Sequence, residues 1–216
     1  MTTRILVTLL LALLLTTRVR TYYGNILLQR LESVQALQVG NALLCTTFSI
    51  NARQGYWATA GHCAVYEAYV SATLKRLPTI GGQPARVIYV DNVIDLAIYQ
   101  SARREPALPQ SPAVPKVCSL ATCELFTLIG FPGGEPRTMN HARLLRRHIR
   151  IGHDTYGIQV SDLLHVLVVG GQSGSPVLNE KGQVVGVLWG GFASTPLSVM
   201  VPLEYLRTGL RPYWRS

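Results

Sequence analysis

Charged residues are scarce in this chain of 216 residues, at 14%, and acidic ones are the scarcer kind. Hydrophobic residues make up 48%, which excludes an intrinsically disordered chain and leaves ample material for a core. Internal repeats and low-complexity tracts are also absent. The length therefore fits one large domain or two small halves.

The chain lacks an N-terminal apolar run long enough for a typical membrane span. The run after Arg4, Ile5–Leu15, is uncharged and has the pattern of the apolar core of an export signal. The residues that follow it fit a small-x-small cleavage site poorly, so an uncleaved signal-anchor is the alternative. We expect residues 1–20 to be a signal peptide or signal-anchor, with membrane anchoring through residues 4–17 in the second case. The domain is then secreted, extracytoplasmic or membrane-anchored.

Cysteine is also sparse, and no C-x-x-C pair is present. The even count in an exported chain favours two disulfides over free thiols. Zinc is the competing interpretation, because His62 stands beside Cys63, but a second Cys/His cluster is missing. We therefore expect no metal. The four cysteines are Cys45, Cys63, Cys118 and Cys123.

Helical periodicity is missing until residues 202–210, where leucines suggest a closing helix. Short strand patterns with frequent turns indicate an all-β sandwich or barrel. Four prolines within residues 103–116 indicate a linker between two β units, and residues 22–37 read as a short helix or irregular lead-in. The expected strands are Gly40–Ile50, Trp57–Ala60, Ala68–Leu74, Ala85–Val90, Leu96–Tyr99, Leu125–Ile129, Ala142–Ile151, Gly157–Val160 and Gln183–Leu188.

A serine lies in the glycine-rich turn Gly171–Pro176, which reads Gly-Gln-Ser-Gly-Ser-Pro. Glycines let the backbone turn tightly and expose its N–H groups. A nucleophilic hydroxyl needs such a turn, because the carbonyl that it attacks becomes an oxyanion that N–H donors must stabilise. Ser173 is therefore a candidate nucleophile, and Ser175 is its rival. Alone, the turn also fits an ordinary connection between two strands.

Two other stretches offer a base and an acid. The segment Trp57–Cys63 places His62 at the end of a strand of small residues, and an imidazole can take and return a proton near neutral pH. Asp95 stands in an apolar strand pattern, where a buried carboxylate needs a hydrogen-bonding partner such as an imidazole N–H. Asp91 is a competing acid, but it stands in what reads as a solvated turn.

Three blocks in this order, TAGHC, DLAIY and GQSGSPV, resemble the His, Asp and Ser blocks of the chymotrypsin-like (trypsin-fold) serine proteases. The chain is most similar to short HtrA-type and trypsin-like peptidases without a PDZ domain. Their G-[FY/N]-P-x-G turn matches Gly130–Gly134, and their stretch from nucleophile to substrate strand resembles GQSGSPVLNEKGQVVGVLWGG. The likeness covers residues 40–210.

This resemblance implies an all-β fold of two antiparallel six-stranded β-barrels with a short C-terminal helix, preceded by an N-terminal hydrophobic signal or anchor helix. The expected parts are a leader at 1–20, a lead-in at 21–39, the first barrel at 40–105, a linker at 106–116, and the second barrel with its helix at 117–216. A bond between Cys45 and Cys63 resembles the family's disulfide beside the catalytic histidine. Cys118 and Cys123 are expected to close a small loop, with two free thiols as the alternative.

The resemblance also implies a serine endopeptidase that acts on polypeptides without a cofactor. Ser173 would be the nucleophile, His62 the general base and Asp95 the group that orients the imidazole. The backbone N–H groups of Gly171 and Ser173 would form the oxyanion hole. A substrate strand would pair with Leu188, Trp189 and Gly190.

Departures from the digestive members of the family indicate a different mode of activation. No I-V-G-G-like N-terminus follows a basic cleavage site, and Gln172 replaces the acid that would receive a freed terminus. We therefore expect no zymogen cleavage. The stretch before the nucleophile, Val166–Gly170 with Leu167 as a substrate-contacting residue, is apolar and predicts cleavage after small or aliphatic residues. Asp162 lies too far upstream by count to serve an Arg/Lys pocket.

Two other classes of function remain as alternatives. One is a catalytically inactive, peptide-binding pseudoprotease. The other is a basic protein that binds a membrane or nucleic-acid surface, since the net charge is +9. Alternating leucine and isoleucine around the basic cluster read more simply as the exposed face of a strand pair, so we do not expect nucleic-acid binding. The cluster comprises Arg143, Arg146, Arg147, His148 and Arg150.

Overall fold

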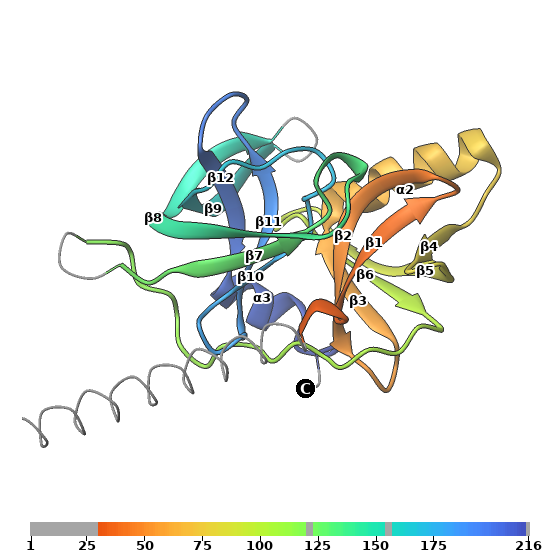
Figure 1. Ribbon diagram of the computed structural model, residues 1–216, viewed down its shortest axis with the longest axis horizontal. Coiled ribbons are helices and arrows are strands. Elements are labelled where there is room, and N and C mark those ends of the chain that lie inside the picture. Colours follow the sequence, from red (N-terminus) through yellow and green to blue (C-terminus); the bar gives the residue numbers. More distant parts are fainter. Residues whose placement is uncertain (1–29, 120–122, 154–156, 215–216) are drawn as a thin grey trace, which may run out of the picture.

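The computed structural model describes residues 30–119, 123–153 and 157–214, and they form two closed six-stranded antiparallel barrels side by side (Figure 1). This is the expected fold. The expected leader, residues 1–20, lies outside the described residues. Within the described ranges, no helix has both the length and the apolar character needed to cross a bilayer.

The first barrel closes in the strand order β1-β2-β3-β6-β5-β4. Its core is aromatic and aliphatic, with Phe48, Trp57 and Tyr99 fully buried. Burial of such large side chains is the main stabilising contribution of a barrel of this size. The strands are β1 (Val34–Val39), β2 (Ala42–Asn51), β3 (Tyr56–Ala60), β4 (Pro78–Ile80), β5 (Gln83–Asp91) and β6 (Leu96–Ser101).

The second barrel closes in the order β10-β11-β12-β9-β8-β7. A disulfide between Cys118 and Cys123 stands at its start. The short helix η1 (Pro132–Gly134) lies between its first two strands, and α3 (Leu203–Gly209) follows its last strand. The strands are β7 (Phe126–Gly130), β8 (Thr138–His153), β9 (Gly157–His165), β10 (Pro176–Leu178), β11 (Val184–Gly191) and β12 (Leu197–Pro202).

The proline-rich segment joins the barrels and contains no strand of its own. It makes one parallel bridge, between Gln110 and Val184 of β11. Around that bridge the Ser111 N–H donates to the Val184 carbonyl at 2.9 Å, and the Val184 N–H donates to the Pro109 carbonyl at 2.8 Å. The linker therefore lies along the second barrel.

Two expectations about the first half were wrong. The expected strand Ala68–Leu74 is the second half of a helix, α2 (Gly61–Leu74). Its buried residues, which include Gly61, Ala64 and Glu67, recur every three positions, and this spacing belongs to a helix. The expected lead-in also ends too late, because Val34–Val39 is strand β1 and pairs with both β2 and β4.

The basic cluster on β8 is partly neutralised inside the fold. Arg147 contacts Glu204 of α3 and lies 3.3 Å from an oxygen of Asp162, which is fully buried. Burial raises the pKa of the Asp162 carboxyl, although the His148 N–H and Arg147 oppose this shift. Asp162 therefore has an ion-pair partner of its own in the second barrel.

Candidate active site

His62 and Asp95 lie in direct contact. The His62 Nδ1 is 2.9 Å from one Asp95 carboxylate oxygen, and the His62 backbone N–H donates to the other oxygen at 2.6 Å. The aspartate is completely buried, whereas the imidazole is 24% exposed. A buried carboxylate is tolerated when it is hydrogen-bonded in this way. The pair fixes both the orientation of the ring and the nitrogen that faces the acid.

The close approach of His62 to Asp95 depends on a glycine. Gly61 begins α2, and a Cβ at this position would lie 2.9 Å from an Asp95 carboxylate oxygen and 2.8 Å from the Leu96 nitrogen. Any larger residue would push the start of the helix away from the acid. Asp91, the competing acid, instead accepts hydrogen bonds from the N–H groups of Val93 and Ile94.

A disulfide joins Cys45 of β2 to Cys63, the residue after the histidine. These two sulfurs and a His62 nitrogen lie within 4.8 Å of one another, and they form a group of three potential metal ligands. Thiolates are the form that binds zinc, and both sulfurs are held in the disulfide. The bond instead ties the histidine to the neighbouring strand.

Ser173 stands in a tight turn before β10. Its hydroxyl donates to the Trp189 carbonyl at 3.2 Å, and its side chain is half-buried. Gly171 and Gly174, on either side of it, have φ values of +89° and +85°, which favour glycine. Ser175 is completely buried, so it cannot meet a substrate.

The serine turn of the second barrel packs directly on the first barrel. A Cβ at Gly174 would lie 2.1 Å from both the Thr46 carbonyl oxygen and the Thr59 hydroxyl. The Thr46 N–H donates to the Ser173 carbonyl at 2.8 Å. Thr46 follows the disulfide-bonded Cys45, and Thr59 is three residues before His62. The histidine strand and the serine turn therefore meet at the junction of the barrels.

Thr46 is a site residue that the sequence analysis missed. Its hydroxyl donates to the Gly171 carbonyl at 2.8 Å and accepts the Phe131 N–H at 3.1 Å. One buried side chain of the first barrel thus holds both the serine turn and the Gly130–Gly134 turn. Nearby, the Gly133 N–H donates to the Gly170 carbonyl at 2.7 Å, which fixes the peptide group that carries the Gly171 N–H.

Replacing Thr46 with valine is expected to lower kcat by about 10- to 100-fold, because the Gly171 carbonyl is no longer held and the N–H of the same residue, the oxyanion donor that the family resemblance implies, shifts with it. Two hydrogen bonds disappear, so the free energy of unfolding should fall by about 2 to 4 kcal/mol. Peptide hydrolysis and urea unfolding measure the two effects. Thr46→Ser keeps the hydroxyl and should restore both values. A valine variant with unchanged kcat would contradict this role.

Gln172, directly before Ser173, stabilises the serine turn through a hydrogen bond of its side chain. It is 1% exposed, and its side-chain carbonyl accepts the Val169 N–H at 2.9 Å. This hydrogen bond closes the loop that leads to the nucleophile. Among the described residues, the N–H groups of Gly171 and Ser173 are not paired with any other backbone group.

A pocket of about 220 Å³ opens beside Ser173. Its described lining contains no charged side chain. Leu188, Gly190, Val168 and Val169 belong to its lining, whereas Leu167 is 59% exposed and is not part of the described lining. Trp189 is nearly buried, and its indole N–H donates to Ser161 at 2.9 Å. The lining is Val168, Val169, Gly170, Ser173, Leu188, Gly190, Gly191, Phe192, Ala193 and Ser194.

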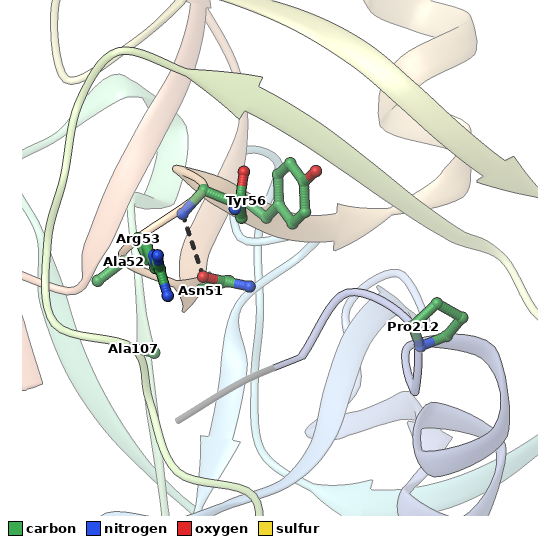
Figure 2. A pocket seen from close by; sticks show the side chains of 7 residues that line it. Asn51, Ala52, Arg53, Tyr56, Ala107 and Pro212 are labelled. Carbon is green, nitrogen blue, oxygen red and sulfur yellow. Dashed lines mark hydrogen bonds between the residues drawn. The ribbon is translucent and has the colours of Figure 1, made fainter.

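A cavity of about 600 Å³ lies elsewhere, between the β2–β3 turn, the linker and the segment after α3 (Figure 2). Asn51 uses its side chain within the protein: its oxygen accepts the Gln54 N–H at 3.1 Å, and its nitrogen donates to the Tyr213 carbonyl at 3.2 Å. Ser173 and His62 are not part of its described lining. The pocket beside Ser173 is therefore the better candidate for a substrate side chain.

Comparisons with known proteins agree with this geometry. The model of the trypsin-like peptidase domain matches residues 45–187. An inactive form of Rv3671c from M. tuberculosis H37Rv has a TM-score of 0.69 and 22% identity, over 87% of this chain and 89% of that chain. The serine endoprotease from Yersinia pestis has a TM-score of 0.65 and 14% identity, over 88% and 65%. For Deg5 the values are 0.63 and 15%, over 86% and 90%. No curated protein sequence matches the chain.

Proposed function

The chain belongs to the trypsin-like peptidase domain family, and we propose that it is a serine endopeptidase in which Ser173, His62 and Asp95 act together. The observation that carries this proposal is the doubly hydrogen-bonded His62–Asp95 pair. A buried acid that holds one imidazole nitrogen directs the other nitrogen toward proton transfer. The serine turn packs against the strand that leads to this histidine.

The proposed reaction uses each group in turn. Ser173 Oγ attacks the carbonyl carbon of the substrate and passes its proton to His62 Nε2. The N–H groups of Gly171 and Ser173 stabilise the oxyanion. The peptide C–N bond then breaks, and His62 gives the proton to the leaving amine. Water, deprotonated by the same imidazole, hydrolyses the acyl-enzyme and restores Ser173.

A phosphonate probe for active-site serines tests this proposal. The full-length protein should be labelled at Ser173, and mass spectrometry of the labelled peptide identifies the site. Ser173→Ala should remain unlabelled. Ser175→Ala is the matched control, because this buried hydroxyl has no hydrogen-bond partner among the described residues, and it should be labelled normally. A correctly folded protein that takes no label would be a pseudoprotease.

We propose that the enzyme cleaves after small or aliphatic residues. The pocket is small and its described lining is uncharged, so a substrate Arg or Lys would lose hydration without gaining an ion pair. Asp162 is already paired with Arg147. In a peptide library, Ala, Val or Leu at the residue before the cleaved bond should be preferred over Arg and Lys by about 100-fold. A strict Arg or Lys preference would contradict this assignment.

A further inference from the structure

The solvent side of α2 carries no charge. Of its 14 residues, the one carboxylate is that of Glu67, which is buried and accepts hydrogen bonds from Ser71 and Tyr99. The exposed side chains of α2 are aliphatic or aromatic, apart from the uncharged Thr73. A solvated helix normally has a charged or polar outer face. Yet α2 lies on the outside of the first barrel (Figure 1).

Large apolar side chains are exposed along α2 and just beyond it. Val65 and Tyr69 are four positions apart on one side of the helix, and Tyr69 is 70% exposed. Leu77, three residues beyond the helix, is 75% exposed. Single exposed apolar residues are common, but several within one short segment indicate a contact surface. We call this group the α2 face; it consists of Val65, Tyr66, Tyr69, Leu74 and Leu77.

Cations border the α2 face and acids are absent from it. Lys75 and Arg76 follow the helix directly, and Arg86 lines the same surface groove as Leu77. Residues 68–90 contain these three cations and no Asp or Glu. A protein partner would account for the apolar residues but not for the neighbouring cations. An anionic bilayer accounts for both, because its interface accepts apolar and tyrosine side chains and its headgroups attract Lys and Arg.

We propose that the α2 face docks onto the surface of an anionic phospholipid bilayer. Val65, Tyr69 and Leu77 enter the interface, and Lys75, Arg76 and Arg86 contact the headgroups. Stable membrane attachment generally requires two signals, and the apolar run Ile5–Leu15 in the sequence offers another. If the proposed function holds, docking also brings the proposed catalytic histidine near the bilayer, because His62 stands in the first turn of α2. Substrates would then be polypeptides at the membrane surface.

Fluorescence of a label on the helix tests this docking. All described cysteines are in disulfides, so Ala72→Cys in the full chain allows an environment-sensitive dye to be attached on the exposed side of α2. With phosphatidylglycerol/phosphatidylcholine vesicles, its emission should shift to the blue and its quenching by acrylamide should fall severalfold. With phosphatidylcholine alone, or at high salt, both effects should shrink. A dye on Lys181→Cys, in the hairpin between β10 and β11, should not respond.

The charge variant Lys75→Gln/Arg76→Gln should weaken the lipid-dependent protection by about fivefold per cation removed. An Ala72→Cys dye that stays equally accessible with both lipids would overturn the proposal. Protection that depends on protein concentration without lipid would also overturn it and indicate a second copy on the α2 face. The same measurement on Ser173→Ala separates docking from catalysis, since the dye response does not require turnover.

Discussion

Replacing Ser173 with alanine is expected to lower kcat for peptide hydrolysis by about 10⁶-fold. Alanine removes the only hydroxyl that the proposed mechanism can acylate. Water must then attack the substrate directly, and only the oxyanion hole and substrate binding accelerate that reaction. The fold should tolerate the change, because the side chain is half-buried and makes one hydrogen bond, to the Trp189 carbonyl. Stopped assays on a chromogenic peptide measure kcat, and circular dichroism checks that the variant is folded.

The matched control for this variant is Ser175→Ala, which should keep wild-type kcat. The double variant Ser173→Ala/His62→Ala should be no slower than either single variant, because residues that act as a unit are non-additive in their effects. Residual activity of Ser173→Ala above one hundredth of wild type would mean that another nucleophile carries the reaction. Additive losses would mean that the serine and the histidine do not share a proton.

The blocks around the proposed triad could be read from the sequence because each is a local signature. A glycine-rich turn around a serine and an acid directly before an apolar strand are chemically unusual, and the order of the three blocks along the chain narrows the choice of fold. Short strand patterns indicate only an all-β sandwich or barrel, and the two barrels are implied by the family resemblance. The first barrel closes through pairings such as Leu37 with Ile80. These residues lie far apart in the chain, and nothing in a single sequence indicates that the two segments pair.

The errors have identifiable physical causes. Tyr69, Val70 and Thr73 are strand-favouring residues, but the helix that begins at Gly61 continues through them, with Val70 packed against the core of the first barrel and the Thr73 hydroxyl bonded to the Tyr69 carbonyl four residues back. Thr46 reads as an ordinary strand residue, and its role depends on a contact with Gly171, 125 positions away. The substrate contact of Leu167 stays a prediction, because the loop before Ser173 is irregular and no periodicity in the sequence shows which of its residues face the pocket.

Asp95 offers the sharpest test of the proposed proton path. Its two carboxylate oxygens accept two different N–H groups of one residue, the backbone N–H of His62 at 2.6 Å and the ring nitrogen Nδ1 at 2.9 Å. Asparagine has nearly the same shape but only one acceptor oxygen. If its NH₂ group faces Nδ1, the imidazole must carry its proton on Nε2, and it can no longer accept the proton of Ser173. If the NH₂ group faces the backbone N–H instead, two donors meet in a buried site.

Asp95→Asn is therefore expected to lower kcat by about 10⁴-fold near neutral pH, as the wrong tautomer does in a Ser-His-Asp site. Part of the activity should return at high pH, where hydroxide substitutes for the missing base, so a pH profile of kcat distinguishes tautomer loss from misfolding. Asp91→Asn is the control, because that carboxylate accepts the N–H groups of its own turn, and it should keep kcat within a few fold. Wild-type activity in Asp95→Asn would show that the imidazole needs no partner, and the acid would then serve only to anchor the start of α2.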